Sequence, residues 1–300
     1  MTISRFLLAA VLLNPGLIWG QQAPPAVAAE SHLLARQYHE GETLSYHMKA
    51  TNQRSGKTLA YEIQGDGVVK KNSDGFYEEF AWSNLIVDGH AVPLPVASQG
   101  LRQMLSLEPT RNIQMPDLSK VHPMMIGPIT DMLTFYGDML IAKTQGKLTR
   151  AGDHFYFKHG TPNSWADGTY VTLGQDSIDF DVTLTEVDHG AKSATVVVRH
   201  VPPPQPQIKI PAEWMRPPVA DTANNWVEVS QAGPGKFSAQ VGKETFVATI
   251  KLNLADGRIV SATLYNPVEV LARECSDPAL TACGEPARFQ ILRQIEISSR

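Results

Sequence analysis

The chain lacks most of the motifs that mark a catalytic or nucleic-acid-binding protein. It contains no Gly-x-Ser-x-Gly or Ser-x-x-Lys motif of nucleophilic hydrolases, and no glycine-rich phosphate loop that opens a predicted helix. Its lysines and arginines form no block, and its formal net charge is −4, so we expect no binding to nucleic acid. No cofactor is predicted.

Long apolar runs are also absent, because none reaches the roughly 20 residues that a membrane-spanning helix needs. Arg5 precedes a short apolar run over residues 6–13, and the chain turns polar soon afterwards. This order is typical of a secretory signal peptide over residues 1–20. We therefore predict an exported protein, periplasmic or extracellular, with a mobile leader over residues 21–40 and no transmembrane anchor in the mature chain.

Only two cysteines occur, Cys275 and Cys283. In an oxidising, exported setting, such a pair predicts one disulfide that closes a small loop. A redox pair would more often have Cys-x-x-Cys spacing, and a zinc site would need two further ligands nearby. We predict a structural disulfide worth about 2–3 kcal/mol and no metal site.

Strict alternation of apolar and polar residues is the main pattern that is present. Phe180, Val182 and Leu184 alternate with polar residues. A second face is formed by Phe76, Phe80, Trp82 and Ile86, with Glu78 and Asn84 as the polar exceptions on it. Such alternation is typical of antiparallel strands with one face on a core. Hairpin turns are predicted at Asp74-Gly75, Asp188-His189-Gly190 and Asp256-Gly257.

Two segments have helical spacing instead. The main predicted helix covers Ile126–Lys143, and a shorter one covers Leu101–Leu107. The predicted fold is α+β and β-dominated: a long-stranded, curved antiparallel sheet, forming an open or half barrel, with one main helix packed on it. Residues 41–300 should form a single β-rich domain, which could divide at the proline-rich segment 202–218.

The C-terminal region allows a specific prediction of pairing. Three adjacent antiparallel strands are expected at Phe246–Leu254, Ile259–Tyr265 and Phe289–Ser298. Pro267 should end the second strand, because proline cannot continue a central one. Residues 266–286 are then expected to form a surface excursion pinned by the disulfide.

Polar clusters offer one candidate for catalysis. Asp153, His154 and His159 lie close together and could serve a hydrolase with a dispersed site. Asp179 and Asp181 share one face of a strand, which suits calcium or acid–base work, but alternation also places solvent-facing residues there.

Apolar side chains suggest a different function. Phe76, Phe80 and Trp82 on a strand, with Met132, Tyr136 and Met139 on the main helix, could line a soft apolar cavity. The same residues could equally form an ordinary sheet–helix core.

We therefore expect an exported, non-enzymatic protein that binds an apolar or lipid-like ligand, or an envelope component, in the concave face of a curved sheet. The alternatives are the exported hydrolase and a surface scaffold or interaction module. The expected architecture resembles the half-barrel carriers of bacterial envelopes that shield acyl chains; the likeness is one of architecture, without a sequence signature.

Overall fold

The computed structural model describes residues 33–93, 102–107, 125, 128–129, 131–132, 148–157, 163–167, 171–175, 179–201, 210–216 and 224–300. The predicted signal peptide lies outside the described residues, as do most of the leader and most of the proline-rich segment. Residues 31–300 belong to one compact unit.

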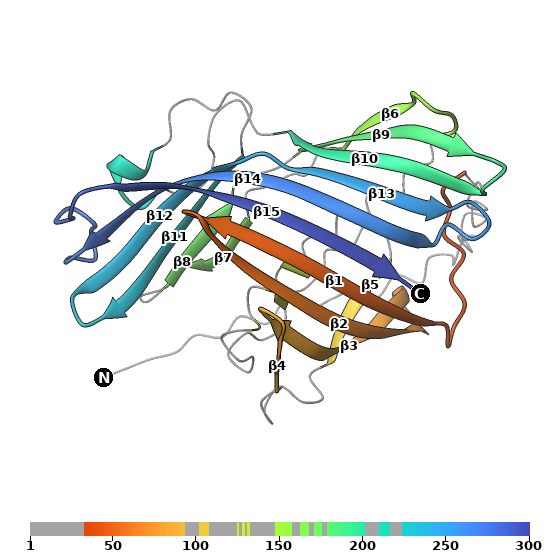
Figure 1. The fold of residues 1–300 in the computed structure, drawn as a ribbon, viewed down its shortest axis with the longest axis horizontal. Helices are drawn as coiled ribbons and strands as arrows, with labels where there is room; N and C mark the ends of the chain where they lie inside the picture. The colour runs from red at the N-terminus through yellow and green to blue at the C-terminus, as the bar shows by residue number, and fades with distance from the viewer. Residues whose placement is uncertain are drawn as a thin grey trace, which may run out of the picture. The chain divides into compact units, whose positions relative to one another are not determined.

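Fifteen strands form one antiparallel sheet (Figure 1). In chain order they are β1 (Thr43–Arg54), β2 (Lys57–Asn72), β3 (Gly75–Val87), β4 (His90–Val92), β5 (Arg102–Ser106), β6 (His154–Phe157), β7 (Asn163–Asp167), β8 (Val171–Gln175), β9 (Asp179–Asp188), β10 (Ser193–Val201), β11 (Asn224–Gly233), β12 (Lys236–Glu244), β13 (Val247–Asn253), β14 (Ile259–Cys275) and β15 (Ala287–Ser299). A short 3₁₀ helix, η3, covers Glu213–Met215.

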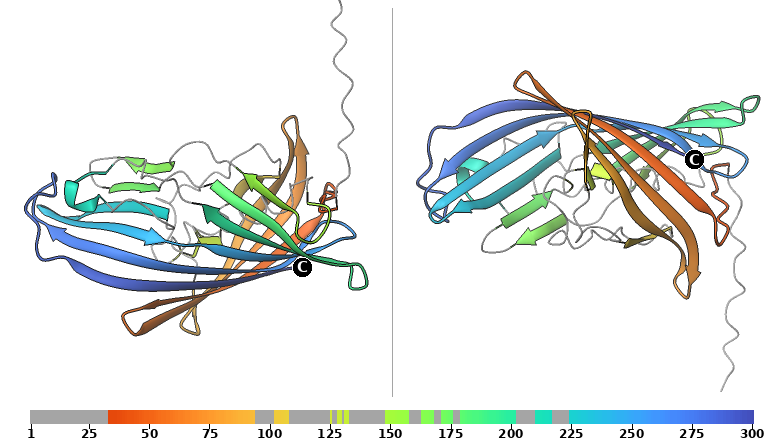
Figure 2. Two further views of the ribbon diagram at one scale, coloured as in Figure 1. Left: turned by 90° about the horizontal axis from the view of Figure 1, so that it is seen from above. Right: turned by 60° about the horizontal axis from the view of Figure 1, so that its bottom comes forward.

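The sheet divides beside β14, its longest strand. The order β4-β3-β2-β1-β15-β14 is continuous up to that point. The first half of β14 then pairs with β13, which leads to β10, β9 and β6, while its second half pairs with β12, which leads to β11, β8 and β7. Figure 2 shows β14 and β15 running along both groups of strands. No pairing among the described strands closes the sheet, so it is open.

The predicted hairpins are confirmed. Asn72 pairs with Gly75, Asp188 pairs with Ser193, and Leu252 pairs with Ile259 across the three turns. Sequence reasoning missed the turn at Ser55-Gly56 between β1 and β2, where both residues have positive φ (48° and 77°). A two-residue turn of this hand matches the twist of the strands that it joins.

The predicted short helix at Leu101–Leu107 is wrong, because residues 102–106 form strand β5. Leu105 lies opposite Glu78 of β3. Leu105 and Leu107 are buried, whereas Met104 is 56% exposed, which is the alternation of a strand. A short apolar run fits either structure, and here the free edge of β3 decided between them.

Of the main helix predicted over residues 126–143, the structure describes only Pro128, Ile129, Asp131 and Met132. These residues have helical backbone, but the described residues contain no helix of seven or more residues. The predicted α+β fold with a main helix is therefore wrong for the described chain, which is all-β. Helical spacing alone is a weak guide here, because an isolated helix of this length is marginal in water.

The end of the predicted leader packs on the sheet. Leu34 is fully buried in the core, and the amide of Gln37 donates to Asp256 O at 3.0 Å. Gly257 is needed at this contact, because a Cβ atom there would lie 2.4 Å from Ala35 O. Described residues 33–40 are thus docked against the β13–β14 turn.

Strand β14 continues through Pro267, which corrects the predicted strand end at Tyr265. The register is continuous, since Val247 pairs with Tyr265 and Glu244 pairs with Val268. The amide of Thr245 donates to Pro267 O at 3.2 Å, but Pro267 has no N–H to return to Thr245 O. The side-chain amide of Asn266 supplies that hydrogen bond instead, at 2.7 Å.

The adjacency of β13, β14 and β15 is confirmed, whereas the excursion is shorter than predicted. Only residues 276–286 lie between the end of β14 at Cys275 and the start of β15 at Ala287. The disulfide therefore closes the tip of a long hairpin.

Candidate functional site

The inner face of the sheet, defined as the face that carries the buried side chains, holds the predicted apolar site. Phe80 (1% exposed), Trp82 (6%) and Met132 (1%) belong to one apolar cluster, and Phe76 packs against it. The rings of Phe80 and Trp82 meet edge to face with their centroids 4.8 Å apart. The predicted partners Tyr136 and Met139 lie outside the described residues.

Two glycines of β2 let the side chains of β3 lie across this face. A Cβ atom at Gly65 would lie 2.0 Å from the ring of Phe80, and one at Gly67 would lie 1.7 Å from Oε1 of Glu78. Both glycines therefore provide space that neighbouring side chains fill.

A bulge changes which residues of β3 point inward. The pairing with β2 shifts between Ile63 and Gln64, so that Leu85 is buried and Ile86 is only partly buried. The prediction that Ile86 shares the face of Trp82 is therefore wrong, because one extra residue reverses the alternation.

An acidic side chain lies within this apolar face. Glu78 is fully buried, and the hydroxyl of Tyr46 donates to its Oε2 at 3.2 Å. The ring of Tyr46 also packs on Phe80, with the centroids 5.7 Å apart. The sequence marks Glu78 as a polar exception on an apolar face, which is the signal that could have identified it.

The apolar face is covered by chain from outside the sheet. Met125, Ile129, Met132 and Leu148, which all lie between β5 and β6 in sequence, are buried in the same cluster. We call Met125, Ile129 and Met132 the cover residues. Side chains from outside the sheet thus complete the apolar cluster to which Phe80 and Trp82 belong.

Asp131 ties the cover residues to the sheet. Its carboxylate accepts a hydrogen bond from the Tyr61 hydroxyl and forms an ion pair with Arg293. Burial and the neighbouring Asp131 carboxylate raise the pKa of Tyr61 far above its usual range. Burial alone would lower the pKa of Arg293, but the carboxylates of Asp131 and Glu244 outweigh burial and raise it.

These groups continue into a polar band, which we define as Tyr61, Asp131, Arg293, Asn266 and Glu244. The guanidinium of Arg293 donates to the Asn266 side chain at 3.0 Å, and Asn266 donates to Glu244 at 3.1 Å. The band joins β2, β15 and β14 with the β12 end at Glu244. Its partners are distant in sequence, and sequence reasoning missed all of them.

The candidate hydrolase site is assembled differently from the prediction. Nδ1 of His154 lies 3.0 Å from Oδ1 of Asp181, and the His154 side chain is 65% exposed. Asp153 instead accepts hydrogen bonds from the amide and hydroxyl of Thr149, which hold its pKa at about 2. His159 lies outside the described residues.

The Asp179 carboxylate, which the sequence suggested for calcium binding or acid–base work, also has a hydrogen-bond partner. Tyr156 donates to Asp179 at 2.6 Å, and this hydrogen bond raises the pKa of Tyr156 to about 12. Among the described residues, no group of three or more His, Cys, Asp or Glu side chains could hold a metal ion.

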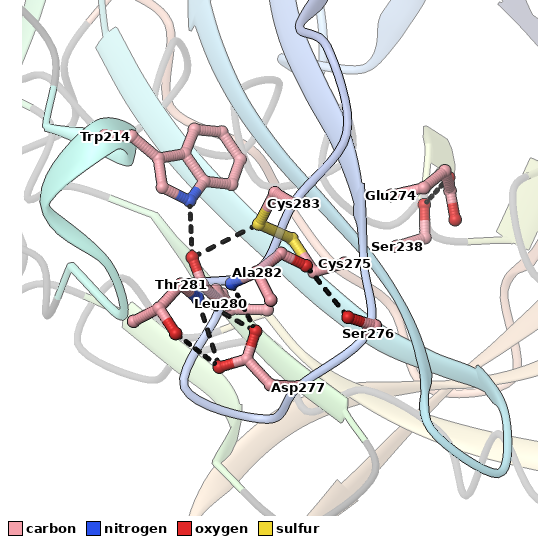
Figure 3. Close-up of a disulfide and its surroundings, with 10 residues drawn as sticks. All are labelled: Trp214, Ser238, Glu274, Cys275, Ser276, Asp277, Leu280, Thr281, Ala282 and Cys283. Carbon is pink, nitrogen blue, oxygen red and sulfur yellow. Dashed lines mark hydrogen bonds between the residues drawn. A yellow bond between two sulfur atoms is a disulfide. The ribbon is translucent and has the colours of Figure 1, made fainter.

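The predicted Cys275–Cys283 disulfide is confirmed, with an S–S distance of 2.03 Å (Figure 3). The Asp277 carboxylate accepts hydrogen bonds from the backbone amides of Thr281 and Ala282, and these bonds order the loop. Figure 3 shows Trp214 pointing at this loop, where its indole N–H donates to Leu280 O at 3.1 Å.

A groove of about 730 Å³ lies beside this disulfide. Its lining mixes backbone with the polar side chains of Lys236, Glu274, Ser276 and Thr281. None of the residues predicted for ligand binding lies in this groove, which is distinct from the apolar inner face.

No protein-family model matches the chain, and a search of curated protein sequences finds no significant match. Among the described residues, no helix has the length and apolar character required to cross a membrane.

Proposed function

We propose that the protein is exported and non-enzymatic, and that it binds an apolar or lipid-like molecule on the inner face of its sheet. One observation supports this most: Phe80 and Trp82 of the sheet share one buried apolar cluster with Met132 and the other cover residues, which are not part of the sheet. Methionine repacks easily around apolar groups of varied shape, so a cover of this composition suits a ligand site.

If the cover residues moved away from the sheet, the aromatic side chains of β3 would be exposed, and no backbone hydrogen bond between strands would have to break. Asp131 supplies the polar attachment of the cover residues, through Tyr61 and Arg293. A ligand would lie between the two layers, in contact with Phe80 on one side and Met132 on the other.

The test is native mass spectrometry of the purified, delipidated protein after incubation with a bacterial lipid extract. We expect a stoichiometric lipid adduct that exchanges with added lipid. Met132→Ala should lower the adduct fraction severalfold, because it removes a buried contact side chain. Met104→Ala is the matched control, because Met104 is 56% exposed on β5 and should leave binding unchanged.

Absence of any adduct with the wild-type protein would contradict the proposal. An adduct that both methionine variants retain equally would place the lipid elsewhere and contradict the assignment to the inner face.

A further inference from the structure

Trp82 has a buried polar group that the described chain does not satisfy. The side chain is 6% exposed on the inner face of β3, and its indole Nε1 has no hydrogen-bond partner among the described residues. Buried tryptophan N–H groups usually find an acceptor. Trp214 follows that rule in this chain, since its N–H donates to Leu280 O.

Among the described residues, the neighbours of Trp82 on the sheet offer its N–H no acceptor. The indole packs on the ring of Phe80, and the residue opposite it on β2 is Gly65, which has no side chain. An external molecule that enters the apolar cluster is therefore a suitable source of an acceptor oxygen.

The apolar surroundings of Trp82 limit the chemical type of the acceptor. Trp82 belongs to a cluster of buried apolar side chains, in which Phe80 is only 1% exposed. An anionic group buried there would lose its hydration, which is costly for an unpaired charge. A neutral acceptor, such as an ester or amide carbonyl, avoids most of that cost.

We infer that the inner face takes an apolar chain bearing a neutral carbonyl group, which accepts a hydrogen bond from the Trp82 indole N–H. This inference rests on the proposed function and specifies the ligand class for the same site. Trp82 is thus a specificity residue that separates neutral acyl compounds from bare hydrocarbons, while the apolar surroundings disfavour fatty acid anions.

The test compares three probes on the delipidated protein: methyl laurate, dodecane and laurate. Wild-type protein should bind methyl laurate about fivefold more tightly than dodecane, as expected for one net hydrogen bond. Trp82→Phe keeps an aromatic ring but removes the donor, so it should abolish the preference for the ester while dodecane still binds. Trp214→Phe is the matched control and should preserve the preference.

A second measurement does not require the Trp82 variant to fold. The chain has five tryptophans, of which Trp19 lies in the predicted signal peptide. In the ¹⁵N-labelled mature protein, the Trp82 indole N–H signal can therefore be assigned by elimination, from variants of Trp165, Trp214 and Trp226. Methyl laurate should move this signal downfield, and dodecane should not.

The outcomes separate the two proposals. If no probe binds to the wild-type protein, the proposed function fails and this inference fails with it. If the ester and the hydrocarbon bind equally, or if the Trp82 signal does not respond to the ester, the inference is overturned while the proposed function stands. Tightest binding of laurate would overturn the assignment of a neutral acceptor.

Discussion

Replacing Asn266 with leucine should strongly destabilise the fold, because Asn266 completes the sheet where proline interrupts it. Asn266 is fully buried and donates to Thr245 O and to Glu244, while it accepts a hydrogen bond from Arg293. Leucine has a similar shape but would leave all three groups short of a partner. An unsatisfied buried group costs about 1–3 kcal/mol. Arg293 still has its ion pair with Asp131 in the variant, so its cost should be at the low end of this range. We therefore expect the free energy of unfolding to fall by about 3 kcal/mol in total.

The assay is urea unfolding followed by circular dichroism, with thermal unfolding as a second probe. A loss of about 3 kcal/mol corresponds to a fall in Tm of roughly 6–12 °C for a domain of this size. Asn84 provides the matched control, because its side chain donates to Gln64 at the exposed surface. Asn84→Leu should change stability by less than about 0.5 kcal/mol.

A double variant tests the reason directly. Pro267→Val restores a backbone N–H that can donate to Thr245 O, so the Asn266→Leu/Pro267→Val protein should recover about 1 kcal/mol. If Asn266→Leu costs less than about 1 kcal/mol, or if restoring the N–H gives no recovery, the reasoning about this position is refuted.

Three further results are expected. Replacing both Cys275 and Cys283 by serine should cost about 2.5 kcal/mol, the chain-entropy value for a separation of 8 residues, while hydrogen exchange shows β14 and β15 still paired. Gly242→Ala would put a Cβ atom 1.9 Å from an indole ring and should cost about 1–3 kcal/mol, whereas Gly233→Ala meets nothing within 4 Å and should be nearly neutral in the same urea assay. The Asp153 carboxylate has its pKa lowered from 3.8 to about 2, so it stabilises the fold above pH 3.8 and loses this effect as pH falls through 2. The Tm of Asp153→Asn should therefore lie below that of the wild-type protein at pH 7 and converge with it near pH 2.

The candidate site shows where sequence reasoning succeeded and failed. The prediction that Phe80 and Trp82 share one face is confirmed, because side chains two residues apart on a strand point to the same side of the sheet. Glu78 was recognised only as an exception on that face. Its burial depends on Tyr46 and Gly67 of neighbouring strands, and no local pattern connects it to either residue.

Local chemistry was sufficient for several elements of the fold. Alternation predicted strands β3, β9, β13 and β15 and the first half of β14, and Asp-Gly turns predicted the β2–β3 and β13–β14 hairpins, because both depend on residues that are close in sequence. The Cys275–Cys283 disulfide followed from the same kind of local information.

Only the tertiary structure decided the features that join distant segments. Residues 102–106 became a strand because the edge of β3 was free to pair with them, and β14 passed through Pro267 because Asn266 replaced the missing hydrogen bond. The hydrogen bond between Asp131 and Tyr61 joins residues 70 positions apart in the sequence, and the contact of Asp131 with Arg293 joins residues 162 positions apart. Short-range patterns thus determined many of the strands and turns, whereas burial and hydrogen bonding between remote segments determined β5, the course of β14 and the polar band. The physical reason is that a buried polar group must find a partner wherever the fold supplies one.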